Sequence, residues 1–216
     1  MKLYLDTTDT CEVQKHMSTG LIDGVTTNYT HLLMSGRHPH DVYNELRVMG
    51  VPDMHLEVVG ETPFIVSEAM KLADEYGENI TIKVPMNRQG LDACRELKRN
   101  LIKTNVSHIF CAAQAILAAK AGATFVSPAV GLIDENSIAG LEVVRSIAEL
   151  YGRQRIHTEV MSSNIHDVYK VTRSFYNGAD AVTMPPYIFE KMYHHVLTDS
   201  GLNQYNNEWN KFSETT

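Results

Sequence analysis

The fold is indicated by a pattern that occurs twice, as Lys120-Ala-Gly-Ala-Thr-Phe-Val-Ser-Pro128 and as Asn177-Gly-Ala-Asp-Ala-Val-Thr-Met-Pro185. Each copy has the character of a helix end, a Gly-Ala turn, an apolar strand and a proline where the strand stops. A helix that passes directly into a strand, and does so repeatedly, is typical of a parallel sheet with helical crossovers. The pattern therefore predicts an α/β protein.

Strand character recurs along the whole chain, in eight short runs at residues 3–5, 24–26, 55–58, 81–84, 104–109, 124–127, 156–160 and 181–183. Amphipathic runs with a helical period lie between them, among them residues 63–76, 89–99, 112–121, 138–151 and 165–177. Glycine, which often ends a helix in the left-handed conformation, follows four of these runs, at Gly77, Gly122, Gly152 and Gly178. We therefore expect a single-domain (β/α)8 TIM barrel over residues 1–216 with an extra C-terminal helix at about 201–212.

Composition and charge exclude several classes of function. Hydrophobic residues make up 44% of the chain and charged residues 21%, which is ordinary for a globular protein. The formal net charge is −7 and no run of Lys or Arg occurs, which argues against a nucleic-acid partner. No signal peptide opens the chain, and no apolar segment approaches the ~20 residues of a membrane span. We expect a cytoplasmic protein with neither a membrane nor a nucleic-acid partner.

The cysteine and histidine patterns predict neither a metal site nor a disulfide framework. The 3 cysteines form no CxxC pair, and the 10 histidines form no HExxH motif. Nothing else in the sequence indicates a bound cofactor. Cys111, just beyond the fifth predicted strand, is expected to be a small buried thiol.

Lys83 is a charged residue inside an apolar strand, Thr81-Ile-Lys-Val-Pro85. Because side chains alternate along a strand, Ile82 and Val84 share one face and Lys83 lies on the other. If Ile82 and Val84 meet the helices, Lys83 points into the barrel near the carboxyl end of its strand, where active sites of this fold lie. Burial disfavours a charged ammonium, and a neutral amine can form a Schiff base. The alternative is a lysine in a salt bridge at the barrel rim.

Other predicted strands place polar groups at the same end. These candidates are Asp6, Thr26, Asn28, Glu57, Asn105 and Ser107. Any one of them could be a strand-end cap or a turn residue. Acid, amide, hydroxyl and amine groups at equivalent ends of five strands are not explained by capping alone.

These groups fit aldol chemistry. Lys83 would attack a ketone carbonyl and form an iminium, which accepts the electrons as the neighbouring C–C bond breaks. Asp6 would take the proton from the substrate hydroxyl, and Glu57 would move protons through a water that Ser107 also holds. The candidates for hydrogen bonds to the substrate hydroxyls are Thr26, Asn28 and Asn105.

At these residues the chain resembles the short-chain transaldolase family, which also contains fructose 6-phosphate aldolase. The motifs that carry the resemblance are Leu3-Tyr-Leu-Asp-Thr7, Gly24-Val-Thr-Thr-Asn28, Ile82-Lys-Val-Pro85, Thr104-Asn-Val-Ser-His-Ile-Phe110, Ala113-Gln-Ala115, Ala121-Gly-Ala-Thr-Phe-Val-Ser-Pro128, His195-Val-Leu-Thr-Asp199 and Gly201-Leu202. They span essentially the whole chain. The motifs are also similar to those of short transaldolases encoded by some cyanobacterial viruses.

The resemblance implies a Schiff-base lysine, no cofactor, and rings of five or ten subunits in which the C-terminal helix reaches a neighbour. An acid at the end of the third strand, here Glu57, resembles the transaldolases, whereas the aldolase branch has glutamine there. This favours transfer of a dihydroxyacetone unit from fructose 6-phosphate or sedoheptulose 7-phosphate to an aldose. The substrates would be pentose phosphate intermediates, in a host cytoplasm if the origin is viral.

Three departures from the family pattern affect substrate binding. Tyr29 stands where the family usually has proline. Ala129 and Leu132 stand where it usually has an aromatic residue and, three residues later, an arginine that binds the substrate phosphate. The seventh strand also lacks the usual Ala-Ala-Ser ending and the basic residue beyond it. Each lost charged contact is worth roughly 1.5–3 kcal/mol, so a phosphorylated acceptor should bind more weakly.

An anion could still bind at the end of the seventh predicted strand. Ser162, Ser163 and Asn164 precede a predicted helix, whose backbone N–H groups could hold a phosphate. Ser162 is therefore a further substrate-binding candidate. The alternative is that Ser163 or Asn164 is only the N-cap of that helix.

Three functions remain open on the sequence alone. The first is a working transaldolase, the second an aldolase or transferase for unphosphorylated carbonyl compounds, and the third a barrel with a structural role and no catalysis. The presence of Lys83, Asp6, Glu57 and Asn28 together argues against the third, because a buried lysine without a function is costly.

Overall fold

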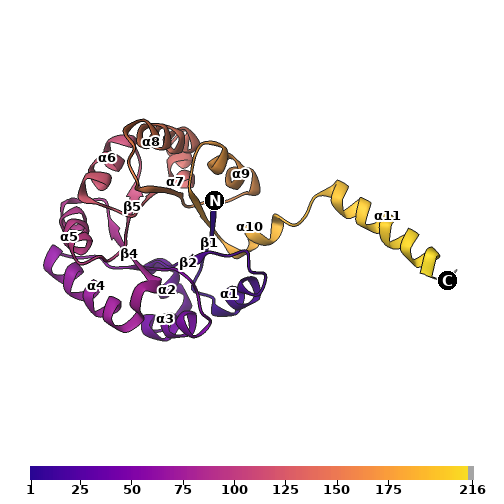
Figure 1. Cartoon of the computed structure of the whole chain (residues 1–216), viewed down its shortest axis with the longest axis horizontal. Coiled ribbons are helices and arrows are strands. Elements are labelled where there is room, and N and C mark those ends of the chain that lie inside the picture. Colours follow the sequence, from indigo (N-terminus) through magenta and orange to yellow (C-terminus); the bar gives the residue numbers. More distant parts are fainter. Residues whose placement is uncertain (214–216) are drawn as a thin grey trace.

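Eight parallel strands close into a barrel in the order of the sequence, so each strand pairs with the next and the last with the first (Figure 1). The computed structural model describes residues 1–213. The strands are β1 Lys2–Asp6, β2 Gly24–Thr26, β3 Met54–Glu57, β4 Ile80–Pro85, β5 Thr104–Ile109, β6 Phe125–Pro128, β7 Glu159–Ser162 and β8 Ala181–Met184. The predicted (β/α)8 barrel is confirmed.

Helices surround the barrel on its outer face, except for the last one, which extends away from it (Figure 1). They are α1 Thr10–Met17, α2 Tyr29–Ser35, α3 Pro39–Val48, α4 Thr62–Tyr76, α5 Arg88–Arg99, α6 Ala112–Ala121, α7 Val130–Glu135, α8 Gly140–Gln154, α9 Val168–Tyr176, α10 Pro186–Lys191 and α11 Val196–Ser213, with the 3-10 turn η1 at Gly77–Asn79. None of these helices is long and apolar enough to cross a membrane.

The two faces of each strand have different environments. The outward face packs on the helices and forms the larger apolar core, which includes Ile82 and Val84 of β4. A smaller cluster fills the inside of the barrel, where Tyr4, Phe125 and Met161 are buried. The predicted alternation in β4 is therefore correct, since Ile82 and Val84 are fully buried toward the helices.

The seventh strand lies later in the sequence than predicted. It was expected at residues 156–160 but runs from Glu159 to Ser162, where Glu159 pairs with Phe125 of β6. Helix α8 causes the shift, because it continues past Gly152 to Gln154 and ends at Arg155, which adopts the left-handed conformation at φ 52°. Glycine costs a helix interior only about 1 kcal/mol, so Gly152 does not end this helix.

Left-handed glycines do end two other helices as predicted. Gly122 follows α6 with φ +90°, and Gly178 closes the turn after α9 with φ +91°. A different glycine allows a close approach of the backbone at the carboxyl end of β4. A Cβ on Gly90 would lie 2.0 Å from the carbonyl oxygen of Pro85, so only glycine lets α5 pack this close to the strand.

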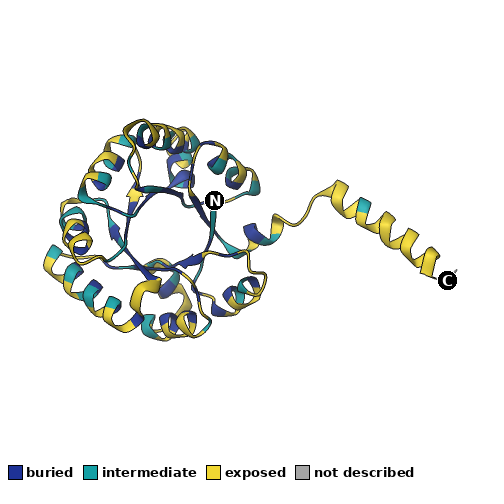
Figure 2. Ribbon diagram, viewed as in Figure 1, coloured by how far each residue is buried: buried dark blue, intermediate teal, exposed yellow. Residues whose placement is uncertain are grey.

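Helix α11 extends away from the barrel (Figure 1) and is exposed along nearly its whole length (Figure 2). It runs from Val196 to Ser213, so the helix expected at about 201–212 is present and begins earlier. None of its residues is buried in the single chain. An apolar stripe at helical spacing lies along it, at Leu202, Tyr205, Trp209 and Phe212.

Candidate active site

A cavity of about 330 Å³ opens at the carboxyl ends of the barrel strands. Seven of the eight predicted site residues line it, namely Asp6, Thr26, Asn28, Glu57, Lys83, Asn105 and Ser107. They come from β1, β3, β4, β5 and the end of β2. Closure of the barrel brings these strands together, because sequence neighbours pair in register and their carboxyl ends meet at one mouth.

Lys83 is held at this mouth by two oxygen atoms. Its side chain is 13% exposed. Its Nζ donates a hydrogen bond of 2.9 Å to the carbonyl oxygen of Thr27 and lies 3.5 Å from Oε1 of Glu57. The Nζ of Lys83 therefore has a carboxylate partner at the edge of the cavity and remains accessible from the cavity.

Glu57 is fixed from the other side by the start of α2. Its Oε2 accepts a 3.0 Å hydrogen bond from the backbone N–H of Tyr29. Proline, which the family usually has at this position, has no N–H to donate. Tyr29 therefore adds a contact to the Glu57 carboxylate that a proline could not make. Burial, together with the Glu57 charge, also raises the pKa of the Tyr29 phenol.

Asp6 lies beside a hydroxyl and an imidazole. Its Oδ1 accepts a 3.0 Å hydrogen bond from Oγ1 of Thr26, which also shares a 2.6 Å hydrogen bond with the hydroxyl of Thr183. The Nδ1 of His31 lies 3.7 Å from the same carboxylate oxygen. His31 and Thr183 both line the cavity and were not among the sequence candidates.

Asn28 is both a helix cap and a cavity residue. Its Oδ1 accepts a 2.8 Å hydrogen bond from the backbone N–H of His31, which makes it the N-cap of α2. Its Nδ2 lies 3.2 Å from the Nδ1 of His31. Asn28 therefore caps α2 and also faces the cavity, and its predicted role in substrate binding stays a prediction.

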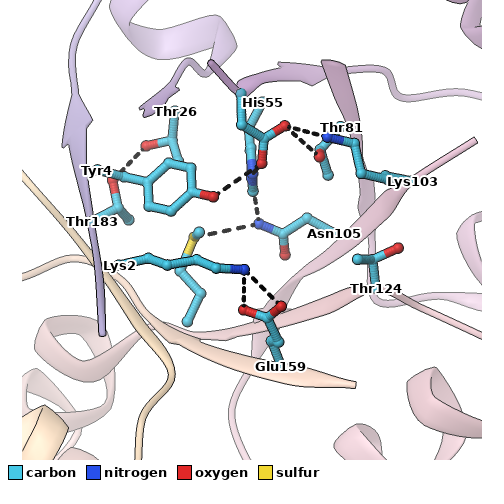
Figure 3. Close-up of polar contacts among 12 residues, drawn as sticks. Lys2, Tyr4, Thr26, His55, Thr81, Lys103, Asn105, Thr124, Glu159 and Thr183 are labelled. Atoms are coloured by element: carbon cyan, nitrogen blue, oxygen red, sulfur yellow. Dashed lines mark hydrogen bonds and ion pairs between the residues drawn. The ribbon is translucent and has the colours of Figure 1, made fainter. Parts of the chain in front are cut away.

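Asn105 lines the cavity and also joins a polar layer inside the barrel (Figure 3). Its Oδ1 accepts a 2.8 Å hydrogen bond from Oγ of Ser127, and its Nδ2 lies 3.0 Å from Nδ1 of the fully buried His55. The Nε2 of His55 in turn lies 3.1 Å from Oδ2 of Asp53. This charged layer was not predicted, because only Glu57 of the third strand had been identified.

Strand β5 departs from regular alternation near its end. Its pairing with β6 shifts register between Val106 and Ile109, and His108 adopts φ 59°. Alternation had placed His108 on the opposite face from Ser107, but both side chains line the cavity and their polar atoms lie 3.3 Å apart. The bulge therefore adds an imidazole that a regular strand would have turned outward.

Ser162 does not line the cavity. Its side chain is fully buried, and its Oγ has no hydrogen-bond partner among residues 1–213. The next two residues, Ser163 and Asn164, line the cavity instead. Met161, the preceding residue of β7, lines the cavity, so alternation along the strand turns the side chain of Ser162 to the opposite face. Within this segment, Ser163 and Asn164 are the structurally better substrate candidates.

The helix expected directly after this segment also begins later. Helix α9 starts at Val168, and its N-cap is Asp167, whose Oδ1 accepts a 2.7 Å hydrogen bond from the backbone N–H of Lys170. Neither Ser163 nor Asn164 is therefore its N-cap. The sequence had suggested that a helix N-terminus directly follows Ser162 to Asn164. The N–H groups at the start of α9 instead lie several residues further on, from Val168.

Two apolar residues line the cavity at the positions where the resemblance predicted an aromatic residue and a phosphate-binding arginine. Ala129 and Leu132 both line it. Lys83 is the one lysine among the lining residues described, which contain no arginine and two histidines, His31 and His108.

Cys111 differs from its expected role. It is exposed rather than buried, does not line this cavity, and precedes α6 as its N-cap residue. Within residues 1–213, no group of three or more histidine, cysteine or acidic side chains is arranged to hold a metal ion.

The sequence matches one family model, described as transaldolase/fructose-6-phosphate aldolase, over residues 3–216. The chain belongs to this family. Relatives named "Probable transaldolase" include proteins from Caulobacter vibrioides, 39% identical over 97% of this chain and 96% of the relative, and Paracoccus denitrificans, 39% identical over 98% and 97%. A third, from Phenylobacterium zucineum, is 37% identical over 100% of this chain and 99% of its own length.

Membership of the transaldolase/aldolase family supports an enzyme, and the similar names support transaldolase-like function. The cavity contains a lysine, two carboxylates and several amides and hydroxyls at the barrel mouth. This set can form a Schiff base, move protons and bind a polyhydroxylated chain.

Proposed function

We propose that this protein transfers a dihydroxyacetone unit from a ketose phosphate, fructose 6-phosphate or sedoheptulose 7-phosphate, to an aldose through a Schiff base on Lys83. The observation that carries the proposal is the position of Lys83. Its amine is mostly buried, lines the cavity and lies 3.5 Å from the carboxylate of Glu57. The family relationship supports the reaction class.

The amine of Lys83 would attack the ketose C2 carbonyl and form a carbinolamine. Loss of water then gives an iminium, with Glu57 moving the protons through a water that Ser107 helps to hold. Asp6 would take the proton from the C4 hydroxyl as the C3–C4 bond breaks. The first aldehyde leaves, and the bond electrons remain on the three-carbon unit as an enamine on Lys83.

The second half of the reaction runs these steps in reverse with a different aldehyde. The enamine carbon attacks the acceptor carbonyl, and protonated Asp6 returns its proton to the new hydroxyl. Water then hydrolyses the iminium and frees Lys83. Thr26, Asn28 and Asn105 are proposed to bind substrate hydroxyls, and the hydrogen bond from Thr26 to Asp6 would also orient the base.

Transfer to unphosphorylated aldoses is a second candidate, favoured by one observation. Ala129 and Leu132 line the wall where a phosphate would need a cation, and no arginine occurs among the described lining residues. Besides Lys83, the basic side chains among the described lining residues are those of His31 and His108. Comparing erythrose 4-phosphate with erythrose as acceptors would separate the two candidates.

Trapping of the Schiff base tests the proposal. The protein would be reduced with borohydride in the presence of fructose 6-phosphate, and its peptides mapped by mass. We expect a three-carbon adduct on Lys83, and none in Lys83→Met. Lys170→Met is a matched control, because Lys170 is also mostly buried and ion-paired, with Asp134, outside the cavity.

Each outcome has a separate meaning. An adduct with dihydroxyacetone but none with fructose 6-phosphate would support the candidate for unphosphorylated compounds. No adduct with either ketone would contradict the Schiff-base mechanism. Asp6→Asn should still form the adduct with dihydroxyacetone but should lose about 10²–10⁴-fold in transfer rate, because Asp6 is needed only when the C–C bond breaks or forms.

We also propose that the protein is a homo-oligomer, of five or ten subunits by family resemblance, assembled through α11. An unburied helix with an apolar stripe over Leu202, Tyr205 and Trp209 would gain stability by packing on a neighbouring subunit. Removal of residues 194–216 should reduce the mass measured by sedimentation to that of a smaller assembly, and an unchanged mass would contradict this role.

The proposed location is the cytoplasm. Cys11, Cys94 and Cys111 are all free thiols, which suits a reducing compartment. Fractionation of cells that contain the tagged full-length chain would test this, with recovery in a membrane or extracellular fraction as the contradicting result.

A further inference from the structure

The inside of the barrel contains a buried ionic group toward the amino ends of the strands, next to Asn105 (Figure 3). Asp53, which precedes β3, accepts hydrogen bonds from Tyr4 at 2.9 Å, Thr81 at 2.8 Å and Lys103 at 2.9 Å. It also lies 3.1 Å from Nε2 of His55. Most barrels of this fold fill this space with branched apolar side chains, so the polar layer needs a specific explanation.

The charge state of Asp53 follows from these contacts. Burial alone would raise its pKa, but the hydrogen bond with His55 and the Lys103 ammonium outweigh burial and hold the pKa well below its usual range. Asp53 is therefore a carboxylate and can only accept hydrogen bonds. The ring nitrogen that faces it, Nε2 of His55, must carry a proton to make its bond.

The tautomer of His55 follows in turn. Its side chain is fully buried, and burial is the main cause that lowers its pKa below the usual 6.5. A neutral imidazole with its proton on Nε2 has a bare lone pair on Nδ1. Since Nδ1 lies 3.0 Å from Nδ2 of Asn105, the amide of Asn105 donates this hydrogen bond and His55 accepts it.

The orientation of the Asn105 amide is then determined. Its Nδ2 faces His55, and its Oδ1 accepts the 2.8 Å hydrogen bond from Ser127. Turning the amide over would place Oδ1 against the Nδ1 lone pair and lose the hydrogen bond. The second N–H of Nδ2 meets only Sδ of Met161, 3.7 Å away, and Met161 itself lines the cavity.

We propose that Asp53 and His55 are positioning residues that hold the Asn105 amide with an N–H group toward the cavity, where it donates to a hydroxyl oxygen of the substrate. The proposal rests on the function proposed above. Asn105 is well placed for this contact, because it lines the cavity and is the direct register partner of Lys83 across β4 and β5.

A proton relay from the barrel floor to the cavity is a different role that the same residues do not fit. The carboxamide of Asn105 stands between His55 and the cavity, and a carboxamide does not take up or release protons near neutral pH. The chain of hydrogen bonds can therefore orient a donor but cannot carry a proton to Lys83.

The tautomer can be measured without any turnover. In protein labelled with ¹⁵N-histidine, long-range ¹H–¹⁵N correlation spectra distinguish a protonated ring nitrogen from a bare one, and His55→Phe assigns the signal. We expect neutral His55 with its proton on Nε2. A proton on Nδ1, or a doubly protonated ring at neutral pH, would overturn the proposal whether or not the protein is a transaldolase.

A double-mutant cycle tests the functional step. His55→Phe should lower kcat/KM for transfer about 10-fold, the cost of one misplaced hydrogen bond. In an Asn105→Ala background the same change should cost nothing more, because His55 acts only through Asn105. Equal losses in both backgrounds would make His55 merely structural and overturn the proposal.

His16→Phe is the matched control for loss of a buried imidazole. His16 is 2% exposed, makes an edge contact with Phe189 and does not line the cavity. It should change the melting temperature without changing kcat/KM. Absence of transfer and of a Lys83 adduct in the wild type would instead contradict the proposed function, and the His55 tautomer would still decide the positioning proposal.

Discussion

Oε1 of Glu57 lies 3.5 Å from Nζ of Lys83, and the two residues are direct register partners in the pair of β3 and β4. Their side chains therefore point to the same side of adjacent strands, into the barrel. The pairing fixes a carboxylate next to the proposed nucleophile with only two strands involved.

Glu57→Gln should lower the rate of transfer by about 10²-fold or more, because glutamine cannot move a proton during formation and loss of the carbinolamine. The family pattern has glutamine here in the aldolase branch, so more of the three-carbon unit should leave as free dihydroxyacetone. The measurement is the ratio of free dihydroxyacetone to the ketose formed by transfer of the three-carbon unit. Glu61→Gln is the control, because Glu61 is exposed and accepts a hydrogen bond from the side chain of Gln89. An unchanged ratio in Glu57→Gln would contradict the role proposed for Glu57.

Tyr29→Pro should remove the N–H donor to Glu57 while leaving α2 intact. Proline is well tolerated at the first position of a helix, and Asn28 before it is already extended, at φ −152° and ψ 162°. We expect kcat to fall about 10-fold, as for loss of a hydrogen bond to a charged group. Tyr29→Ala keeps the N–H and separates the effect of the ring. Equal activity of Tyr29→Pro and Tyr29→Ala would show that the bond has no catalytic effect.

Leu132→Arg should restore a cation to the cavity wall. The ratio of kcat/KM for erythrose 4-phosphate to that for erythrose should rise about 10- to 100-fold, because a guanidinium forms charge-assisted hydrogen bonds with phosphate. Leu132→Gln provides a neutral side chain of similar length for comparison. A ratio that rises equally in both variants would attribute the change to polarity rather than to charge.

The buried imidazole should make stability depend on pH. Below 6.5, the usual pKa, the unfolded chain protonates His55 while the folded protein keeps it neutral, so the free energy of unfolding falls as pH falls. The maximum slope for one group is about 1.4 kcal/mol per pH unit. The charges that face the ring are the Asp53 carboxylate and the ammonium groups of Lys83 and Lys103.

Urea unfolding of wild type and His55→Phe between about pH 7 and about pH 5 would measure this contribution. The difference in unfolding free energy between the two proteins should change steadily below 6.5, with wild type losing more stability than the variant. Parallel curves for the two proteins would mean that His55 becomes protonated in the folded state at its ordinary pKa.

The inward direction of Lys83 could be predicted from sequence, because alternation along a strand is local. Apolar neighbours at Ile82 and Val84 require the helix-facing side, and lysine must take the other. The repeated helix–strand unit likewise predicted the closed parallel barrel. Asp6, Glu57 and Asn105 followed from the same alternation and from the rule that carboxyl ends of parallel strands meet at one mouth.

The position of a glycine did not predict the end of every helix, because a helix can continue through glycine at a low cost in free energy. Helix α8 passes through Gly152, and the seventh strand begins later than predicted. Met161 in that strand lines the cavity, so Ser162 faces away from it, and Ser163 and Asn164 beyond the strand line it instead. The face that a residue presents changes with a shift of one position. The position of β7 is set by its pairing with β6 and β8 and not by the local sequence.

The sequence by itself determined the number and order of strands, the barrel, and which strand ends have the reactive groups, because these depend on short-range periodicity. Only the tertiary structure decided the inward turn of His108, the Tyr29 contact to Glu57 and the layer of Asp53 and His55 below Asn105. These relationships join residues far apart in sequence. A bulge or a cross-strand hydrogen bond depends on what the neighbouring strand places opposite each residue, and closure of the barrel sets that pairing.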